Sequence, residues 1–209
     1  CIIGQDNHIF QFASIGDDPQ DKKYGGEPTR LVIGDRNTIR EYCTINRGTV
    51  QDREETRVGN DNWIMSYVHI AHDCVIGDQI IFANNTTLGG HVQIDDWAIL
   101  GGFTAVHQFC HIGKHAFTGI FTAVTKDVPA YVLASGSPAV PRGINTEGLK
   151  RRGFSTDQIS NIREGYRVLY RQDLKLEDAV KKLEKRAETQ EEILVLLESV
   201  RASSRGIIR

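Results

Sequence analysis

The sequence predicts an all-β parallel solenoid followed by a small α-helical domain, and two observations support this prediction. Between positions 58 and 124 an apolar or small residue recurs every six residues, a period that fits neither an amphipathic helix nor a half-buried strand. After position 155 the apolar residues take the spacing of amphipathic helices. A six-residue period is typical of a parallel β-helix, in which each hexad supplies one short strand and a turn.

The hexad repeat is almost unbroken, and only Thr118 is not plainly apolar. Its positions are Val58, Ile64, Ile70, Ile76, Phe82, Leu88, Ile94, Leu100, Val106, Ile112, Thr118 and Val124. Three hexads make one triangular coil, so residues eighteen apart should stack as neighbouring strands, about 4.8 Å apart. The apolar residue should point inward. The small residue that often follows it, such as Gly59, should turn the corner through a positive φ or a close backbone approach.

The same register extends upstream and predicts a β-helix domain over residues 1–135. Its upstream positions are Ile3, Ile9, Ile15, Ile33, Ile39 and Ile45. Residues 16–32 interrupt the repeat with Gly, Pro and charges, which predicts an exposed functional excursion loop about one coil long. The acidic residues 51–55 predict only a solvated turn. Because Cys1 already stands close to the register, we expect that further N-terminal coils are missing from this sequence.

The C-terminal third is expected to contain a linker and a helical domain. Residues 136–154, which include Gly136, Pro138, Pro141 and Gly143, predict a linker. Ser155 and Gln158 form a capping-box pattern that opens the α-helical domain, residues 155–209. Apolar stripes predict helices over about 156–171 and 176–187, and a third that starts near Thr189, with Glu191 and Glu192 in its first turn.

Composition excludes several classes of protein. The chain has 209 residues, 40% apolar and 25% charged, and its net charge of −2 argues against bulk nucleic-acid binding. No apolar run approaches the roughly 20 residues of a membrane span. Four cysteines, Cys1, Cys43, Cys74 and Cys110, show no metal-binding spacing and are typical of small hydrophobic residues in a reducing compartment. Cytoplasm is the simplest localisation.

The segment between positions 142 and 171 is basic, because it contains seven basic residues and only three acidic ones, Glu147, Asp157 and Glu164. The basic residues are Arg142, Lys150, Arg151, Arg152, Arg163, Arg167 and Arg171. The stretch is either a solvated helix face or a docking surface for phosphate or an acidic protein.

The coils also predict where chemistry gathers. The third residues of three successive hexads should form one file on the prism: His72, Gly90 and Gln108. The eighteen-residue spacing puts two more stacked pairs beside this file: His91 over Asp73, and His107 over Gly89. Two chemistries could use such a group. Several imidazoles could bind zinc, or one histidine could act as a general base, oriented by a carboxylate, beside a backbone amide that stabilises an oxyanion.

Longer motifs resemble one enzyme family over essentially the whole chain. They are Asp21–Tyr24, Gly26–Arg30, His69–Cys74, Ala83–Asn85, Gly90–Val92, Thr104–Cys110 and Asn145–Phe154. Together they are similar to the UDP-N-acetylglucosamine 3-O-acyltransferases, which open lipid A synthesis in Gram-negative bacteria. The resemblance implies a left-handed β-helix with a helical C-terminal domain, a homotrimer, and a 3-hydroxyacyl donor carried on the phosphopantetheine of acyl carrier protein. It implies no other cofactor and no metal.

The resemblance also implies roles for individual residues. His72 would be the general base for the sugar 3-hydroxyl, Asp73 would orient it, and the Gly90 amide would hold the thioester oxyanion. The residues that would bind the sugar nucleotide are Asp21, Lys23, His69, His91, His107, Gln108, Asn145, Glu147, Arg151 and Arg152.

Two positions depart from better-known members of the family. Asn46 replaces a histidine, and Asn cannot titrate near neutral pH. Ile120 replaces a glycine, and with Gly102 one coil below it is expected to set the length of the acyl chain. A zinc-dependent hexapeptide-repeat carbonic anhydrase and a non-enzymatic trimeric scaffold are the alternative functions. The sequence leaves open whether the acceptor carries a 3-hydroxyl or a 3-amino group.

Overall fold

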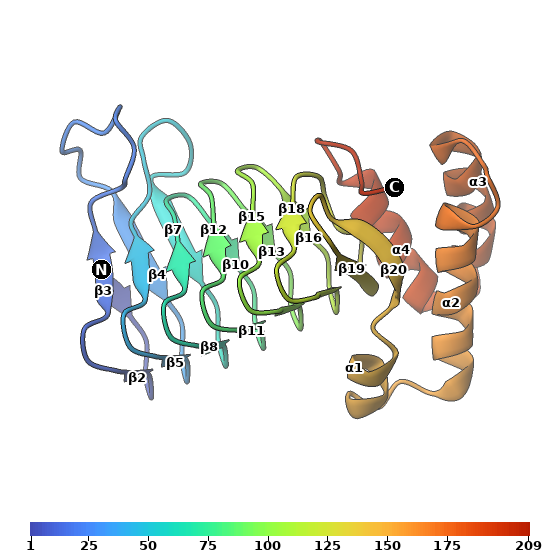
Figure 1. The fold of residues 1–209 in the computed structure, drawn as a ribbon, viewed down its shortest axis with the longest axis horizontal. Helices are drawn as coiled ribbons and strands as arrows, with labels where there is room; N and C mark the ends of the chain where they lie inside the picture. The colour runs from blue at the N-terminus through green and yellow to red at the C-terminus, as the bar shows by residue number, and fades with distance from the viewer.

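The computed structural model describes residues 1–209 and shows a triangular β-prism whose C-terminal end is covered by helices (Figure 1). Three sheets form its sides. The first sheet contains β1 (Ile2–Ile3), β4 (Arg30–Ile33), β7 (Glu55–Val58), β10 (Val75–Ile76), β13 (Gln93–Ile94) and β16 (His111–Ile112). The second contains β2 (His8–Ile9), β5 (Thr38–Ile39), β8 (Trp63–Ile64), β11 (Ile81–Phe82), β14 (Ile99–Leu100), β17 (Phe117–Thr118), β19 (Val132–Ser135) and β20 (Val140–Ile144). The third contains β3 (Ser14–Asp17), β6 (Thr44–Asn46), β9 (His69–Ile70), β12 (Thr87–Leu88), β15 (Ala105–Val106) and β18 (Ala123–Val124).

The coils stack in the predicted eighteen-residue register. Val75 pairs with Gln93 and Ile76 with Ile94, and the strands of the prism run parallel. Every inward hexad position from 58 to 124 is buried. The predicted solenoid is therefore confirmed, with its core along the prism axis.

Thr118, the one polar inward position, is buried because its hydroxyl finds partners inside the prism. Its Oγ1 lies 2.9 Å from Oγ1 of Thr104 and accepts a hydrogen bond from the Gly101 N–H at 3.2 Å. A buried hydroxyl is costly only when it lacks such partners. A polar residue is therefore tolerated at this inward position because its hydroxyl is hydrogen-bonded.

The turns between sheets form three vertical corners, to which we give names. The histidine corner joins the third sheet to the first and includes residues 71–74, 89–92 and 107–110. The α1 corner joins the first sheet to the second and includes 77–80, 95–98 and 113–116. The aromatic corner joins the second to the third and includes 83–86, 101–104 and 119–122.

Glycine is needed at these corners because the backbones of neighbouring coils approach closely there. The predicted positive φ occurs at other residues of the turn. A Cβ on Gly59 would sit 2.5 Å from the carbonyl oxygen of Gly77 in the next coil, so only glycine fits there. The positive φ falls instead on the third residue after the inward position, for example 64° at Tyr67 and 63° at His91. The left-handed turn is therefore made by non-glycine residues, most of them exposed or half-buried, with buried Asp73 as an exception.

Both interruptions of the repeat leave from the histidine corner. The first loop spans residues 18–29, shorter than the predicted 16–32, because Asp17 and Arg30 already pair with neighbouring strands. The second loop spans residues 47–54. Figure 1 shows both loops rising on the same side of the prism near its N-terminal end. The register survives both loops, since Ile15 pairs with Ile45 across the first and Ile45 pairs with Ile70 across the second.

The predicted linker over 136–154 is wrong, because this segment forms a strand and a helix. β20 pairs antiparallel with β19 and lies at the edge of the second sheet, where Pro141 needs no ladder partner for its missing N–H. α1 (Thr146–Arg151) follows, capped by the Asn145 side chain, which accepts from the Gly148 N–H. The predicted helices are confirmed as α2 (Thr156–Tyr170), with its capping box, α3 (Leu176–Ala187) and α4 (Glu191–Arg201). None of these helices is long and apolar enough to cross a membrane.

The helices are attached to the last coil by buried polar contacts. Asp127, which is 3% exposed, accepts hydrogen bonds from the His111 N–H at 2.8 Å and from Oγ of Ser203 at 2.6 Å. Oγ of Ser199 on α4 accepts from the Ala130 N–H at 2.9 Å. A solenoid end needs a cap over its core, and these contacts hold the helical cap in place.

The α1 corner carries a ladder of stacked rings. The ring of His115 lies 6.1 Å from Trp97 and 5.7 Å from Tyr131, nearly parallel to both, and the guanidinium of Arg152 lies 5.0 Å over Trp97. Nη1 of Arg152 is 3.3 Å from Nδ1 of His115. Burial, assisted by the charges of Arg152 and Lys114, lowers the pKa of His115 to about 4. His115 is therefore neutral in the folded protein at ordinary pH.

Three of the cysteines, Cys43, Cys74 and Cys110, are buried free thiols, as expected for small hydrophobic residues. Burial raises the pKa of Cys74 to about 12, so its thiol stays protonated and donates a weak hydrogen bond to the Gly89 carbonyl oxygen at 3.3 Å.

Gly59→Ala should destabilise the prism by about 1–3 kcal/mol, because the added methyl group must push two coils apart. Gly143→Ala is the matched control, since a Cβ there meets nothing within 4 Å. Thermal unfolding followed by circular dichroism compares the two. Equal melting temperatures for both variants would contradict close approach as the reason for glycine at this corner.

Stability should fall as the pH drops from about 6.5 to about 4. Over this range the histidine of the unfolded chain takes up a proton, while His115 of the folded protein stays largely neutral. The free energy of unfolding should therefore fall by about 2–3 kcal/mol over the full range. His115→Gln should make the pH dependence shallower by that amount, as measured by denaturant unfolding at several pH values. The hypothesis fails if parent and variant lose stability in parallel.

Candidate active site

The histidine corner and the two loops enclose a cleft of about 660 Å³. Its lining is largely polar and consists of Gln20, Asp21, Lys23, Gln51, Asp52, His72, His91, Gln108 and Phe109. Five of the residues expected to bind or transform substrate meet there: Asp21, Lys23, His72, His91 and Gln108. The first two come from the first loop and the others from successive coils, so the cleft exists only because loop and corner share one side of the prism.

At the base of the cleft His72 is paired with Asp73. Nδ1 of His72 lies 2.9 Å from Oδ2 of Asp73, and the His72 side chain is 14% exposed while that of Asp73 is fully buried. Thr49 of the second loop donates to the same carboxylate from its N–H at 3.0 Å and from its hydroxyl at 2.6 Å. Because an ionised Asp73 can only accept a hydrogen bond, a neutral His72 carries its proton on Nδ1, which donates to the carboxylate. The other ring nitrogen, Nε2, is then unprotonated and can act as a base.

The charge of Asp73 is secured by its hydrogen bonds. Burial, the largest influence, raises the pKa of Asp73, but the bonds from His72 and Thr49 outweigh it and hold that pKa below its usual range. The carboxylate therefore remains ionised at neutral pH and can stabilise an imidazolium on His72 when it forms.

Gly90 lies directly above the imidazole of His72, as the stacking predicted. A Cβ on Gly90 would sit 2.6 Å from Cε1 of His72, so any side chain would collide with the ring. The Gly90 N–H has no acceptor within the chain. A free amide beside a free imidazole nitrogen is the pair of groups that acyl transfer requires.

His91 is held by the second loop, which corrects the reading of residues 51–55 as a mere solvated turn. Nδ1 of His91 lies 2.7 Å from Oδ2 of Asp52. The ring stacks on Phe109, 4.3 Å away and nearly parallel, and meets His72 edge-on at 5.0 Å. Sequence spacing could not reveal Asp52, because thirty-nine residues and an irregular loop separate it from His91.

Two predicted histidines lie near the cleft without lining it. His69 is half-buried, with Nδ1 2.6 Å from Oγ1 of Thr44, and burial together with the charge of His72 lowers its pKa. His107 is exposed and its Nδ1 lies 3.1 Å from its neighbour's carbonyl oxygen. Asn46 is 5% exposed and donates from Nδ2 to the carbonyl of Asp18 at 2.9 Å, so this departure from the family pattern anchors the first loop.

Four predicted substrate-binding residues lie on or beside α1, which Figure 1 shows at the opposite edge of the molecule from the two loops that line the cleft. Asn145 is buried, and besides capping α1 it donates from Nδ2 to the carbonyl of His115 at 3.0 Å. Glu147 is exposed and pairs with Lys150 at 3.0 Å. Arg151 is exposed, whereas Arg152 is half-buried against the ring ladder.

Ile120 and Gly102 lie at the third corner, the aromatic one. Ile120 is 65% exposed. A Cβ on Gly102 would meet only the Asn84 carbonyl oxygen, at 3.5 Å, so the surface below Ile120 is open. Phe103 and Phe121 stack beside them with ring centroids 4.9 Å apart.

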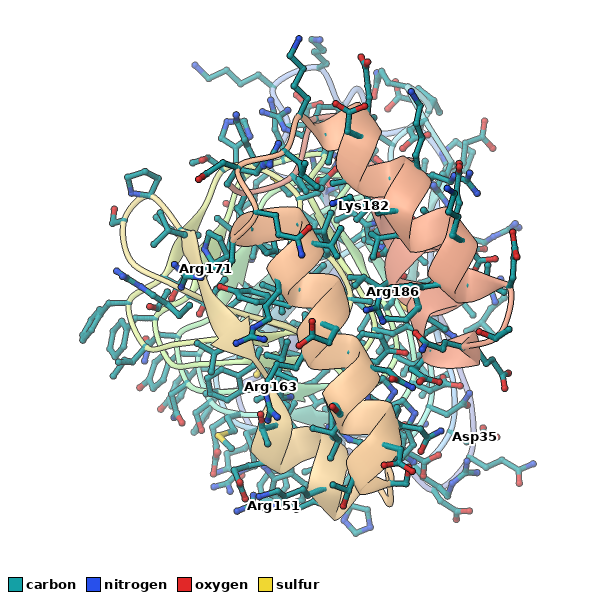
Figure 2. The ribbon with its side chains drawn as sticks, turned by 90° about the vertical axis from the view of Figure 1, so that its right-hand side faces the viewer. Asp35, Arg151, Arg163, Arg171, Lys182 and Arg186 are labelled. Atoms are coloured by element: carbon teal, nitrogen blue, oxygen red, sulfur yellow. The ribbon has the colours of Figure 1, made fainter.

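The exposed members of the basic stretch form a strip that runs from β20 through α1 to α2 on the helical end of the molecule, while Arg152 is half-buried against Trp97. Figure 2 shows Arg151, Arg163 and Arg171 following one another along this face. Lys150 and Arg167 pair with neighbouring acids, at 3.0 Å each, while Arg163 and Arg171 have no acidic partner in the chain.

A metal could be held only at the His72, Asp73 and His91 cluster, whose ligand atoms lie within 4.8 Å of one another. Oδ2 of Asp73 already accepts bonds from Thr49 and His72, and Nδ1 of each histidine faces a carboxylate. Two Nε2 atoms therefore remain, and no third imidazole lines the cleft. A zinc site of three convergent imidazoles does not fit these residues.

Known proteins match this chain over nearly its whole length. Residues 127–208 match the family model described as Udp N-acetylglucosamine O-acyltransferase, Domain 2, and residues 55–90 match the bacterial transferase hexapeptide model. A protein of Herminiimonas arsenicoxydans named acyl-(acyl-carrier-protein)–UDP-N-acetylglucosamine O-acyltransferase is 60% identical, with 99% of this chain and 80% of that protein covered. A relative of the same name from a Janthinobacterium species is 61% identical over 98% of this chain and 79% of its own length.

A solved structure shows the same likeness. The crystal structure of UDP-N-acetylglucosamine O-acyltransferase from Moraxella catarrhalis superposes with a TM-score of 0.96 at 49% identity, and the match covers 99% of this chain and 80% of that one. The chain therefore belongs to the UDP-N-acetylglucosamine O-acyltransferase family and has its left-handed parallel β-helix followed by a helical domain.

Proposed function

We propose that the protein transfers a (R)-3-hydroxyacyl group from acyl carrier protein to the 3-position of UDP-N-acetylglucosamine, the first step of lipid A synthesis. The observation that carries this proposal is the His72–Asp73 pair directly beneath the free N–H of Gly90. Relatives with about 60% identity are named for this reaction. The acceptor group is a hydroxyl in this proposal, because that is the group the relatives' name specifies.

Each step of the reaction uses a group already in position. Nε2 of His72 removes the proton of the sugar 3-hydroxyl as its oxygen attacks the thioester carbonyl. The Gly90 N–H stabilises the oxyanion of the tetrahedral intermediate, and Asp73 stabilises the imidazolium. The C–S bond then breaks, and His72 returns the proton to the departing thiol. An ester and free carrier protein result.

Asp21, Lys23, His91 and Gln108 line the same cleft and are proposed to bind the sugar nucleotide. Lys23 supplies a positive charge for the diphosphate. His69 and His107 complete this set by resemblance. No further cofactor is needed, since the acyl group arrives already activated as a thioester.

A homotrimer would unite the residues that one chain keeps apart. The α1 corner bears Asn145, Glu147, Arg151 and Arg152, far from the cleft of the same chain, and the exposed aromatic corner bears Ile120. Packing one corner against another corner of a neighbouring copy around a three-fold axis brings such groups together. We place the active sites at these subunit interfaces.

The basic strip is proposed to receive acyl carrier protein, which is acidic. Arg163 and Arg171 have no acidic partner in the chain and so present free positive charge. The buried free thiols suit a reducing compartment, and we place the enzyme in the cytoplasm.

The first test is His72→Ala, which should lower kcat by roughly 10²–10⁴-fold, the usual contribution of a general base. The fold should persist, because the side chain lies outside the prism core. A transfer assay with hydroxyacyl carrier protein and UDP-N-acetylglucosamine gives the rate, and His8→Ala, an exposed histidine on β2, is the control. Near-parental turnover in His72→Ala would exclude it as the base.

The second test concerns the length of the acyl chain. Ile120 is proposed to block the far end of the open surface over Gly102, along which the acyl chain would lie. A short donor, with about ten to twelve carbons, should therefore be preferred over a longer one. Overpacking costs of about 1–3 kcal/mol imply a preference of about 5- to 150-fold. Ile120→Gly should shift the preference to longer donors in a series of hydroxyacyl carrier proteins. An unchanged preference in a correctly assembled variant would exclude Ile120 and leave Phe117 and Phe121 as the next residues to test.

A further inference from the structure

The second loop, residues 47–54, supports both histidines of the cleft. Thr49 of this loop is 1% exposed and donates two hydrogen bonds to Asp73, the partner of His72. Three residues later, Asp52 accepts from Nδ1 of His91 at 2.7 Å. The cleft therefore contains two carboxylate–imidazole pairs, and residues of one loop form hydrogen bonds within both.

The two pairs differ in how deeply the carboxylate is buried. The Asp73 side chain is fully buried, whereas that of Asp52 is 40% exposed. The imidazoles are equally enclosed, since the side chains of His72 and His91 are each 14% exposed. The imidazole of His91 is therefore largely enclosed by protein, whereas the carboxylate that pairs with it belongs to a surface loop.

The ring of His91 has little freedom to move. Phe109 stacks on one face at 4.3 Å, and the His91 N–H donates to the carbonyl of His72 at 3.0 Å. An exposed ion pair ordinarily contributes little, because its partners are mobile and solvated. Here one partner is held by a stacked ring and a backbone bond, so the geometry of the pair is set before any ligand arrives.

The protonation pattern of His91 follows from this contact. An ionised carboxylate only accepts hydrogen bonds, so a neutral His91 facing Asp52 must carry its proton on Nδ1. Its other nitrogen, Nε2, then has a lone pair and can accept a hydrogen bond from a hydroxyl group. Without the carboxylate, both tautomers become available, and Nε2 is a donor part of the time.

We propose that Asp52 is a positioning residue that holds neutral His91 in its Nδ1-protonated form, so that Nε2 accepts a hydrogen bond from a hydroxyl of the acceptor sugar. Asp52 acts through His91 and takes no part in the transfer of the acyl group, which remains with His72. The assignment rests on the proposed function to the extent that the sugar occupies this cleft.

The first experiment measures the tautomer itself. The histidine ¹⁵N signals of labelled protein are recorded at pH 8, above the ordinary imidazole pKa, and the His91 signals are identified by their loss in His91→Gln. The parent should show a protonated Nδ1, and Asp52→Ala should move the signals toward the Nε2-protonated form. Asp52→Asn keeps an acceptor oxygen and should retain most of the parental pattern. Glu54→Gln, an exposed residue of the same loop that lies outside the cleft lining, is the matched control and should change nothing.

The second experiment separates binding from chemistry. Asp52→Ala should raise KM for UDP-N-acetylglucosamine about three- to tenfold, the effect of weakening one hydrogen bond, and change kcat by less than about twofold. Asp52→Asn should restore most of the loss in KM. A parental His91 with an unprotonated Nδ1, or a tautomer shift that leaves KM unchanged, would overturn the proposal. If the parent transfers no acyl group at all, the proposed function fails, and the ¹⁵N measurement alone still decides whether Asp52 sets the tautomer.

Discussion

The tight vertical spacing of the coils is the constraint on which the site depends. Parallel strands bring residues eighteen apart into contact, and the corners leave no room for a Cβ where Gly59 faces the next coil. The same spacing puts Gly90 against the ring of His72, so a backbone amide lies beside the proposed general base. In this fold a catalytic group is positioned by the coil above it as much as by its own neighbours.

The histidine corner is also where the fold accepts insertions. Both loops leave the third sheet and return to the first, and Ile45 still pairs with Ile15 before the first loop and with Ile70 after the second. An insertion at a corner changes no strand and costs little closure entropy, so polar loops can grow there without disturbing the core. Because the loops and the histidine file share one corner, Asp21 of the first loop and Asp52 of the second reach the same cleft.

Each corner has a different chemistry. The histidine corner holds the His72–Asp73 pair, the α1 corner holds half-buried Arg152 in a ladder of rings, and the aromatic corner exposes Ile120 beside stacked phenylalanines. A rigid prism cannot bend one corner onto another. In the proposed trimer, neighbouring copies of the chain combine these groups.

Periodic features could be read from the sequence because one spacing governs both the core and the stacking. The hexads, the file of His72, Gly90 and Gln108, and the capping box at Ser155 all follow from fixed offsets along the chain. The non-periodic features depended on three-dimensional packing. Asp52 reaches His91 only through the path of an irregular loop, and α1, a short helix after two prolines, depends on its Asn145 cap and on contact with the last coil. Offsets along a repeat determine which residues stack, whereas contacts made by loops and caps depend on where a non-repeating backbone returns, and no local spacing encodes that.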